Sequence, residues 1–311
     1  MITVPPALDA TRSIHPGWAA WLDGLPRLAG QLLDDWGLVP DGEPAHGETA
    51  LVLPVLDDDG RRLALKIGMP DTDNAGEIPT LKAWGGRGAV HLERADPRRG
   101  AMLLERLHQR DLHTVDDLDA CTIIGRFSPL LHVAASPTIP DLEPFVSRWL
   151  DDLEALGRDV PAPPRFVEHA LHAGRSLLLD SPRLVVHGDL HQGNVLAADR
   201  EPWLVIDPKG FAGDPCFDVA PVLWNRWDEA VASGDVGARI RDRFFVVVDA
   251  AGLDEHRCRD WVVVRAMITV AWEVGEAREN RLPLTDAQRR WITRTVTVAK
   301  AMQAVDDGPG W

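Results

Sequence analysis

The residues best suited to chemistry lie in one short stretch, "LVVHGDLHQGNVL", which is followed by the segment "IDPKG". Two histidines four residues apart, His187 and His191, could bind a metal ion together. The same region holds Asp189, Asn194 and Asp207, whose carboxylate and amide oxygens are the ligands that Mg²⁺ prefers in proteins. The stretch therefore raises two alternatives, a histidine metal site and a site for phosphoryl transfer.

The histidine pair fits a zinc site poorly. Histidines at positions i and i+4 bind zinc together when a helix holds them on one face. Here Gly188 lies between the two histidines, just past the apolar run "LVV", so we expect a strand and then a tight loop. In such a loop the two imidazoles would hydrogen-bond to backbone groups or to a carboxylate. A zinc hydrolase is therefore the weaker hypothesis, and a plain surface turn is weaker still because it would not explain the spacing of the acids.

Phosphoryl transfer accounts for more of the pattern. Asn194 lies five residues after Asp189, which is the separation of Asp and Asn in the catalytic loop of protein kinases. Asp207 ends the second apolar run of a predicted hairpin, which returns it to the edge where Asn194 begins the first run. We predict that Asp189 is the base that acts on an acceptor hydroxyl and that Asn194 and Asp207 bind Mg²⁺.

Composition limits the class of protein. The chain has 311 residues, 45% of them hydrophobic and 26% charged, and the longest apolar run is too short to cross a bilayer. The net charge of −15 argues against a nucleic-acid partner, which requires a basic face. The first residues do not form a secretory signal, and three well-separated cysteines indicate no disulfide framework. We expect a cytoplasmic protein with reduced, structural cysteines, no membrane contact and no protein partner.

The first third of the chain predicts a small lobe rich in β-strands. Leucines and tryptophans at helical spacing predict two short helices between His15 and Trp36, separated at "GLP". Two pairs of apolar runs joined by turn residues predict hairpins, "TALVLPVL" with "RRLALKIG" and "AVHLERA" with "AMLLERL". Between the hairpins we expect a helix from about Asn74, its cap, to Trp84, where a Gly-Gly pair ends it.

Beyond Leu107 the sequence predicts mostly helices. Thr285 and Gln288 form a capping-box pattern at the start of the last one. The predicted amphipathic segments run from about Val115 to Val133, Pro144 to Leu156, Arg165 to Leu179, Val236 to Ala251, Arg257 to Glu279 and Asp286 to Ala304. The predicted fold is therefore α+β, with a small β-rich lobe followed by a larger helical lobe.

The motif "HGDLHQGNVL" followed by "IDPKG" resembles the aminoglycoside phosphotransferase family, and within it the streptomycin 6-kinase and hydroxyurea phosphotransferase branch. The similarity continues through "LALKIG", "EIPTLKAWGGRGAV", "MLLERL" and "GDPCFDVAPVLWNR" and covers most of the chain from about Gly47 to Asn225. It implies a protein-kinase-like two-lobe fold, with a nucleotide-binding lobe at residues 1–107 and a catalytic and acceptor-binding lobe at 108–311.

The resemblance also implies the activity and its cofactors. These are transfer of a phosphoryl group from ATP, or GTP, with Mg²⁺, to a hydroxyl of streptomycin or a related aminoglycoside. Alternative acceptors are hydroxyurea and metabolites such as amino sugars. A catalytically inactive nucleotide-binding module is a more remote alternative, which the presence of Asp189, Asn194 and Asp207 disfavours.

The same resemblance assigns residues to the nucleotide. Lys66 would contact the α- and β-phosphates, and Glu77 would hold Lys66. The backbone of Glu105 and Leu107 would bind adenine. The sequence departs from the kinase pattern at two places: "HGETALV", with Gly47 and Thr49, replaces a glycine-rich loop, and Pro79 lies in the Glu77 helix, where it is tolerated only in the first turn.

Acidic and aromatic residues cluster in three segments that could bind a small cationic sugar as the acceptor. Carboxylates pair with ammonium or guanidinium groups, and indole faces attract cations. Each residue alone could equally belong to a solvated helix face, but tryptophan and acid recur together. The candidates are Asp151 and Asp152; Trp224, Asn225, Asp228 and Glu229; and Trp272, Glu273 and Glu276.

Overall fold

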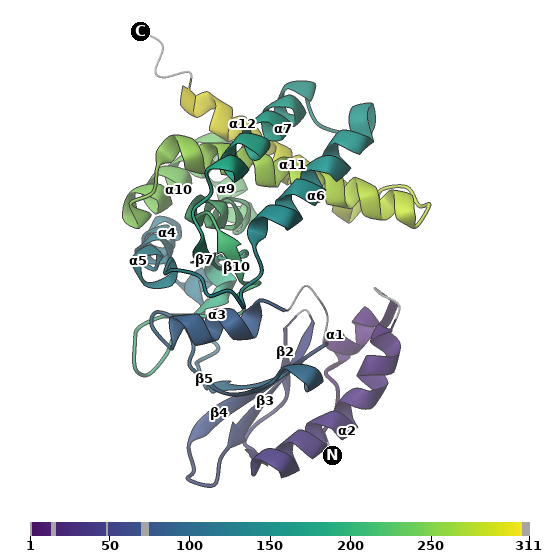
Figure 1. Ribbon diagram of the computed structural model, residues 1–311, viewed down its shortest axis with the longest axis vertical. Helices are drawn as coiled ribbons and strands as arrows, with labels where there is room; N and C mark the ends of the chain where they lie inside the picture. Colours follow the sequence, from purple (N-terminus) through teal and green to yellow (C-terminus); the bar gives the residue numbers. More distant parts are fainter. Residues whose placement is uncertain (1, 14–16, 48, 70–74, 307–311) are drawn as a thin grey trace.

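The computed structural model describes residues 2–13, 17–47, 49–69 and 75–306. Figure 1 shows two lobes, with a sheet and a few helices at the bottom and a larger group of helices at the top. The predicted α+β architecture is thus confirmed. The division between residues 107 and 108 stays a prediction.

The lower lobe is built on an antiparallel sheet with the strand order β1-β3-β4-β6-β5, and β2 pairs with β3 at its side. Both predicted hairpins are present, since β3 pairs with β4 and β5 with β6. In β4 buried residues alternate with less buried ones, which turns Lys66 away from the face that Leu65 and Ile67 bury. The strands are β1 (Val39–Pro40), β2 (Ala45–His46), β3 (Ala50–Leu56), β4 (Arg62–Gly68), β5 (Leu92–Asp96) and β6 (Ala101–Glu105).

One long helix, α2 (Trp18–Trp36), covers the first face of this sheet, after the short α1 (Pro6–Asp9). The prediction of two helices there was wrong, because Pro26 lies inside α2 without ending it. The buried positions continue at helical spacing through the proline, from Leu22 and Leu25 to Ala29, and the burial outweighs one lost backbone hydrogen bond. His15 lies outside the described residues.

The second face of the sheet carries α3 (Glu77–Trp84), which lies between the lobes in Figure 1. Leu81 and Trp84 of α3 are part of a core that also includes Met102 and Leu104 of β6. Pro79 is the third residue of α3, in its first turn as required, and Gly85 ends the helix in a left-handed conformation as predicted. Asn74, the predicted cap, lies outside the described residues.

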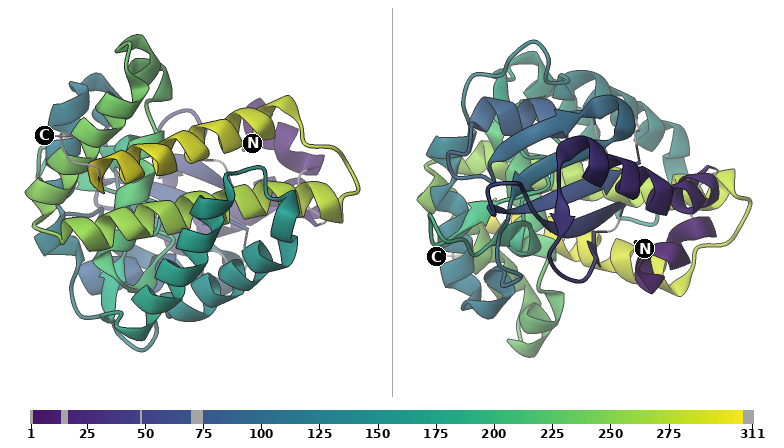
Figure 2. Two further views of the ribbon diagram at one scale, coloured as in Figure 1. Left: turned by 90° about the horizontal axis from the view of Figure 1, so that it is seen from above. Right: turned by 90° about the horizontal axis from the view of Figure 1, so that it is seen from below.

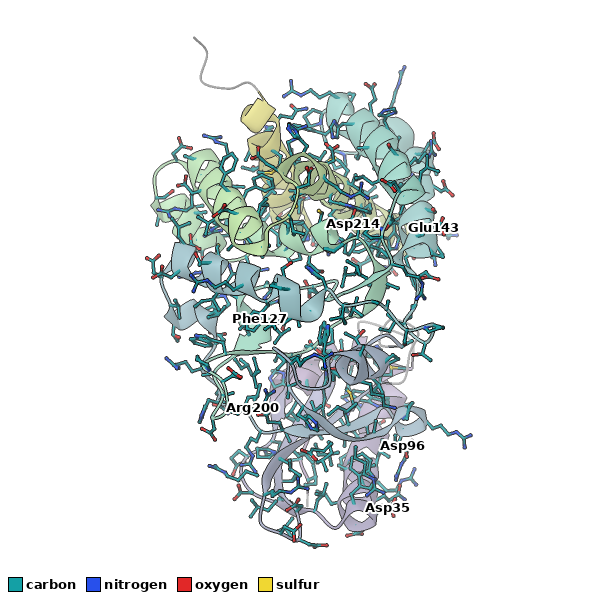
Figure 3. The ribbon with its side chains drawn as sticks, turned by 60° about the vertical axis from the view of Figure 1, so that its left-hand side comes forward. Asp35, Asp96, Phe127, Glu143, Arg200 and Asp214 are labelled. Atoms are coloured by element: carbon teal, nitrogen blue, oxygen red, sulfur yellow. The ribbon has the colours of Figure 1, made fainter. Side chains whose placement is uncertain are left out.

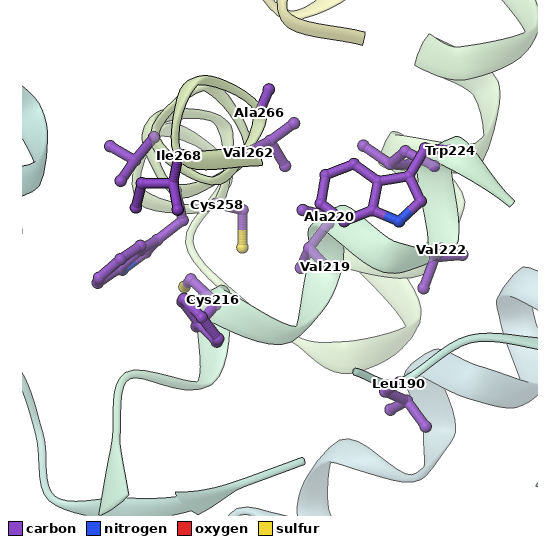
Figure 4. Packing of buried hydrophobic residues seen from close by; sticks show 14 of the residues in the cluster. Leu190, Cys216, Val219, Ala220, Val222, Trp224, Cys258, Val262, Ala266 and Ile268 are labelled. Carbon is purple, nitrogen blue, oxygen red and sulfur yellow. The ribbon is translucent and has the colours of Figure 1, made fainter. Parts of the chain in front are cut away.

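The upper lobe surrounds α11 (Glu255–Glu279), which is buried for most of its length. Figure 4 shows α11 side chains, among them Cys258 and Val262, facing Cys216 and Ala220. All three cysteines are free, as predicted, and each is buried. The other helices are α4 (Asp117–Arg126), α5 (Ser128–Leu131), α6 (Leu142–Leu156), α7 (Pro164–Leu179), α8 (Ala220–Trp224), α9 (Trp227–Ala232), α10 (Val236–Ala251) and α12 (Asp286–Asp306).

The last two helices pack against each other along their length, as the view from above in Figure 2 shows. The predicted capping box opens α12: the Thr285 N–H donates to Gln288 Oε1 at 2.9 Å, and the Gln288 N–H donates to Thr285 Oγ1 at 3.2 Å. Within the described ranges no helix has the length and apolar character needed to span a bilayer.

Candidate active site

The loop that carries Asp189 follows the short strand β7 (Leu184–Val186), which pairs with β10 (Phe211–Gly213). Gly188 has a φ of 86°, a conformation that favours glycine and turns the chain sharply after the strand. The buried carboxylate of Asp218 accepts from the N–H of His187 at 2.8 Å and from that of Gly188 at 2.7 Å. These two bonds fix the backbone directly ahead of Asp189.

The His187 imidazole is engaged through both of its nitrogens. Nδ1 accepts from the Asp189 N–H at 3.1 Å, and Nε2 lies 2.9 Å from the carbonyl oxygen of Ile206, to which it donates. His187 therefore braces the loop, as expected of a histidine that is not a metal ligand. His191 also braces it, since its Nδ1 accepts from the Gly193 N–H at 3.1 Å. In the part of the chain that the structure describes, no three His, Cys, Asp or Glu residues are grouped as metal ligands.

Asn194 and Asp207 flank the same end of the hairpin β8 (Val195–Leu196) and β9 (Leu204–Val205). The Ile206 N–H donates to the carbonyl oxygen of Asn194 at 2.9 Å, which joins the two strand ends. The Asn194 amide nitrogen donates to the carbonyl oxygen of Asp189 at 2.9 Å. That bond leaves the amide oxygen of Asn194 as an available ligand, so the oxygen donors at this point suit Mg²⁺.

Asp207 adopts a φ of 59°, an uncommon conformation for a residue other than glycine. Backbone strain of this kind persists where the surrounding structure enforces it, and it is frequent at functional sites. Here the Asp207 carboxylate contacts the ammonium group of Lys66. The contact joins the hairpin of the helical lobe to β4 of the sheet lobe.

Lys66 also forms an ion pair with Glu77, with 2.6 Å between Nζ and Oε1. Burial opposes the charge on Lys66, but the carboxylates of Glu77 and Asp207 prevail and raise its pKa above the ordinary value. The Lys66 cation lowers the pKa of Asp207 to about 2. Burial raises the pKa of Glu77, and the charge of Lys66 opposes this rise. The three groups thus form one charged cluster in which Lys66 and Asp207 stay ionised at neutral pH.

Close backbone packing holds α3 against the segment after Asp207. A Cβ atom on Gly76, just ahead of α3, would lie 1.9 Å from the carbonyl oxygen of Gly210. A Cβ on Gly210 would lie 2.3 Å from the carbonyl oxygen of Gly76. Only glycine fits at either position. The segment "DPKG" therefore sets the position of the helix that carries Glu77.

The sequence also predicts other residues at the nucleotide, and their contacts lie outside this cluster. Gly47 and Thr49 lie in the turn between β2 and β3, where the Gly47 N–H donates to Ala50. The Glu105 N–H donates to the His91 carbonyl oxygen at 2.9 Å within the sheet lobe, so it is not available to adenine. Leu107 is half-buried against the larger core. Arg200, which lies between the lobes in Figure 3, binds both carboxylate oxygens of Glu105 at 2.9 and 3.0 Å.

The acceptor candidates divide into two groups. Trp224 is 5% exposed and lies under the Arg265 guanidinium, 5.4 Å from its ring centroid, so it is a packed residue beside the loop. The Asn225 side chain donates to the Pro221 carbonyl at 2.8 Å. By contrast Trp272, on α11, is an exposed side chain in contact with Trp149 of α6.

The acids also differ in their partners. Asp151 lies 3.7 Å from Arg175 of α7, and Asp152 lies 3.9 Å from Arg148 on its own helix. Burial and the neighbouring Glu276 carboxylate raise the pKa of Glu273. Of the acids on α9, Asp228 is exposed, and Glu229 pairs with Arg226 at 2.6 Å.

Two residues that hold the catalytic loop were not singled out from the sequence. Asp218 lies in the quoted segment "GDPCFDVAPVLWNR", but nothing in the sequence indicates its contact with a loop 30 residues earlier. Arg265 of α11 donates to the Gly188 carbonyl at 3.0 Å and to the Phe217 carbonyl at 2.9 Å. Burial lowers the pKa of Arg265 to about 10, so it stays a cation at neutral pH.

These features define a kinase-like phosphotransferase. They are the ion pair of a strand lysine with a helix glutamate, the Asp-x₄-Asn loop, and a second aspartate that contacts the lysine where the two lobes meet. The chain belongs to the aminoglycoside/hydroxyurea antibiotic resistance kinases, whose family model matches residues 35–276.

Individual relatives agree with this membership. Streptomycin 6-kinase of Streptomyces glaucescens is 38% identical over 297 residues, which cover 93% of the chain and 97% of that protein. Hydroxyurea phosphotransferase of Kitasatospora aureofaciens is 38% identical over 292 residues, covering 91% and 83%. The crystal structure of choline kinase LicA from Streptococcus pneumoniae shares the fold, with a TM-score of 0.58, 15% identity and coverage of 90% and 99%.

Proposed function

We propose that the protein transfers the γ-phosphoryl group of ATP to a hydroxyl of streptomycin or a close guanidinylated relative. The observation that carries the reaction is the junction of Lys66, Glu77 and Asp207 beside a loop in which Asn194 binds the backbone of Asp189. The acceptor is supported by the 38% and 36% identity to two proteins named streptomycin 6-kinase, over 93% and 88% of the chain.

In the proposed mechanism the Asp189 carboxylate accepts the proton of the acceptor hydroxyl. The hydroxyl oxygen forms a bond to the γ-phosphorus as the bond from that phosphorus to the β–γ bridging oxygen breaks, and ADP leaves. Lys66 binds the α- and β-phosphates, and Glu77 keeps it in place. The oxygens of Asn194 and Asp207 would hold Mg²⁺, which neutralises phosphate charge when bound.

A second acceptor, hydroxyurea, has equal support from sequence identity, since the relative named for it is also 38% identical. Its small size and lack of charge distinguish it from streptomycin. Hydroxyurea is too small to reach carboxylates away from Asp189 and has no charge to pair with them, so we expect it to be the poorer substrate. An amino sugar stands between the two in size and charge.

A panel of acceptors tests the proposal: streptomycin, hydroxyurea and an amino sugar, each with ATP or GTP and with or without Mg²⁺. We expect Mg²⁺-dependent formation of phosphorylated streptomycin. Asp189→Asn should lower kcat by several orders of magnitude with little change in ATP affinity, because Asp189 acts on the acceptor. Nucleotide binding without phosphoryl transfer to any acceptor would instead support the inactive binding module, and near-normal turnover by Asp189→Asn would refute the assigned base.

A further inference from the structure

Four aromatic side chains form a continuous row on the helical lobe, named here the aromatic track: Phe211, Phe145, Trp149 and Trp272. The ring centroids of Phe211 and Phe145 are 5.1 Å apart, those of Phe145 and Trp149 are 6.1 Å apart, and those of Trp149 and Trp272 are 4.9 Å apart. The first three rings are partly exposed, and Trp272 is 45% exposed. A row built only for the core would not leave every member open to solvent.

The aromatic track begins at the catalytic loop. A Cβ atom on Gly188 would lie 3.1 Å from the Phe211 ring, so that ring lies against the residue preceding Asp189. Phe211 is also the first residue after the segment "IDPKG", four positions beyond Asp207. One end of the aromatic track is therefore beside the groups proposed to carry out phosphoryl transfer.

The helix α11 gives the track its length. Arg265 of α11 binds the Gly188 carbonyl, and Trp272 and Glu276 follow it at seven and eleven residues, on the same helical face. Seven residues of α-helix span about 10 Å. Trp272, at the far end of the track, thus lies about 10 Å along α11 from Arg265.

The helix α6, which packs on α11, supplies the other side. Phe145, Trp149 and Asp152 are at positions i, i+4 and i+7, so one face of α6 carries two rings and then a carboxylate. Asp151 points to another side of α6, toward Arg175 of α7. By helical position the carboxylates of Asp152 and Glu276 lie beyond Trp149 and Trp272, at the far end of the track. Asp152 is 3.9 Å from Arg148, and Glu276 accepts from the Gln288 side-chain amide at 3.0 Å.

We infer that the aromatic track binds the part of an extended, positively charged acceptor that lies away from the reacting hydroxyl. Ring faces suit sugar rings and cationic groups, and the carboxylates complement positive charge. The length of the track exceeds a molecule the size of hydroxyurea, so it would select acceptors by length. This inference rests on the proposed function, because it places the reacting hydroxyl at Asp189.

Trp272→Ala tests the inference, with steady-state kinetics for streptomycin and for hydroxyurea. We expect the KM for streptomycin to rise about two- to fivefold, the range of one cation–π contact at an exposed site, with kcat changed less than about twofold. The kinetics of hydroxyurea should not change. Trp272→Phe should have a KM for streptomycin closer to the wild-type value than to that of Trp272→Ala, because it keeps an aromatic face.

Phe245→Ala is the matched control. Phe245 lies on α10, is 42% exposed and contacts another ring, that of Phe244, at 5.5 Å between centroids. Its removal should leave both KM values unchanged. If Trp272→Ala keeps the wild-type KM for streptomycin, or raises both KM values equally, the inference is refuted while the kinase stands. If the wild-type protein phosphorylates no acceptor at all, the proposed function fails and the inference fails with it.

Discussion

The Lys66–Glu77 pair is the residue-scale feature on which nucleotide binding should depend most directly. Glu77→Gln keeps the size of the side chain but removes the charge that holds Lys66, and of the two carboxylates that contact Lys66 among the described residues Asp207 remains. We expect the KM for ATP to rise about tenfold or more, since loss of one partner of a buried ion pair costs several kcal/mol. Steady-state kinetics with varied ATP measure the effect, and Glu201→Gln, an exposed glutamate, is the control. An unchanged KM would contradict the role of the pair.

His191 should make stability depend on pH. Burial lowers the pKa of His191 below its ordinary value of about 6.5, although the charge of Asp189 opposes this. Since the unfolded chain then takes up a proton at a higher pH than the folded one, stability is full above pH 6.5 and falls as the pH decreases below it. His191→Asn removes the titration but keeps an acceptor for the Gly193 N–H. Its Tm should drop less than that of the wild type between pH 7.5 and 5.5; an equal drop would contradict the prediction.

Single residues were predictable from the sequence where a motif carries them. The spacing within "HGDLHQGN" identified Asp189 and Asn194 as neighbours of one loop, and the structure joins them by a hydrogen bond. Asp218 and Arg265 were not predictable, because they act on backbone groups 30 and 77 residues away. Contacts of that kind depend on tertiary packing, which no local pattern encodes.

At the scale of elements, the contact between Gly76 and Gly210 links α3 to the segment after Asp207. Gly76→Ala would force a Cβ to within 1.9 Å of a carbonyl oxygen, and the backbone must move. We expect a loss of about 1–3 kcal/mol in the free energy of unfolding. The KM for ATP should also rise, because the next residue is Glu77. Denaturant unfolding and ATP kinetics measure the two effects.

The control for this substitution is a glycine inside a helix, with space around it. Gly24 lies in α2, and its added Cβ would meet nothing within 4 Å. Gly24→Ala should therefore stabilise the protein by about 0.5–1 kcal/mol without changing the KM for ATP. Equal effects of the two substitutions would show that the close contact at Gly76 has no functional consequence.

Helices and strands were predictable where the spacing of apolar residues agrees with the turn and capping residues at the ends. Both hairpins follow the alternation of their strands and the turn residues between them. The prediction of two helices in place of α2 was wrong because it assumed that Pro26 ends a helix. The apolar face of α2 continues past Pro26 and packs on the sheet. A proline costs one hydrogen bond and some strain, and a buried face of several leucines offsets this.

At the scale of the whole molecule, the arrangement of α6 against α11 determines which acids and aromatics lie together. The sequence predicted clusters of tryptophan and acid in three separate segments. The structure brings Trp272 to Trp149, a residue not singled out before, and buries Trp224 as a packed side chain. The order of helices in space depends on side-chain fit between surfaces far apart in the chain, so it could not be derived from local periodicity.

The net charge of −15 should make binding of a cationic acceptor depend on salt. A negatively charged protein attracts cations over distances comparable to the Debye length, which falls from about 30 Å at 0.01 M to about 10 Å at 0.1 M ionic strength. The KM for streptomycin should therefore rise with added NaCl. For hydroxyurea, which is neutral, the KM should stay constant and so controls for effects of salt on ATP or on folding. Initial rates at fixed saturating ATP and Mg²⁺ measure both. A salt-independent KM for streptomycin would contradict this prediction and show that its binding owes little to the acidic surface.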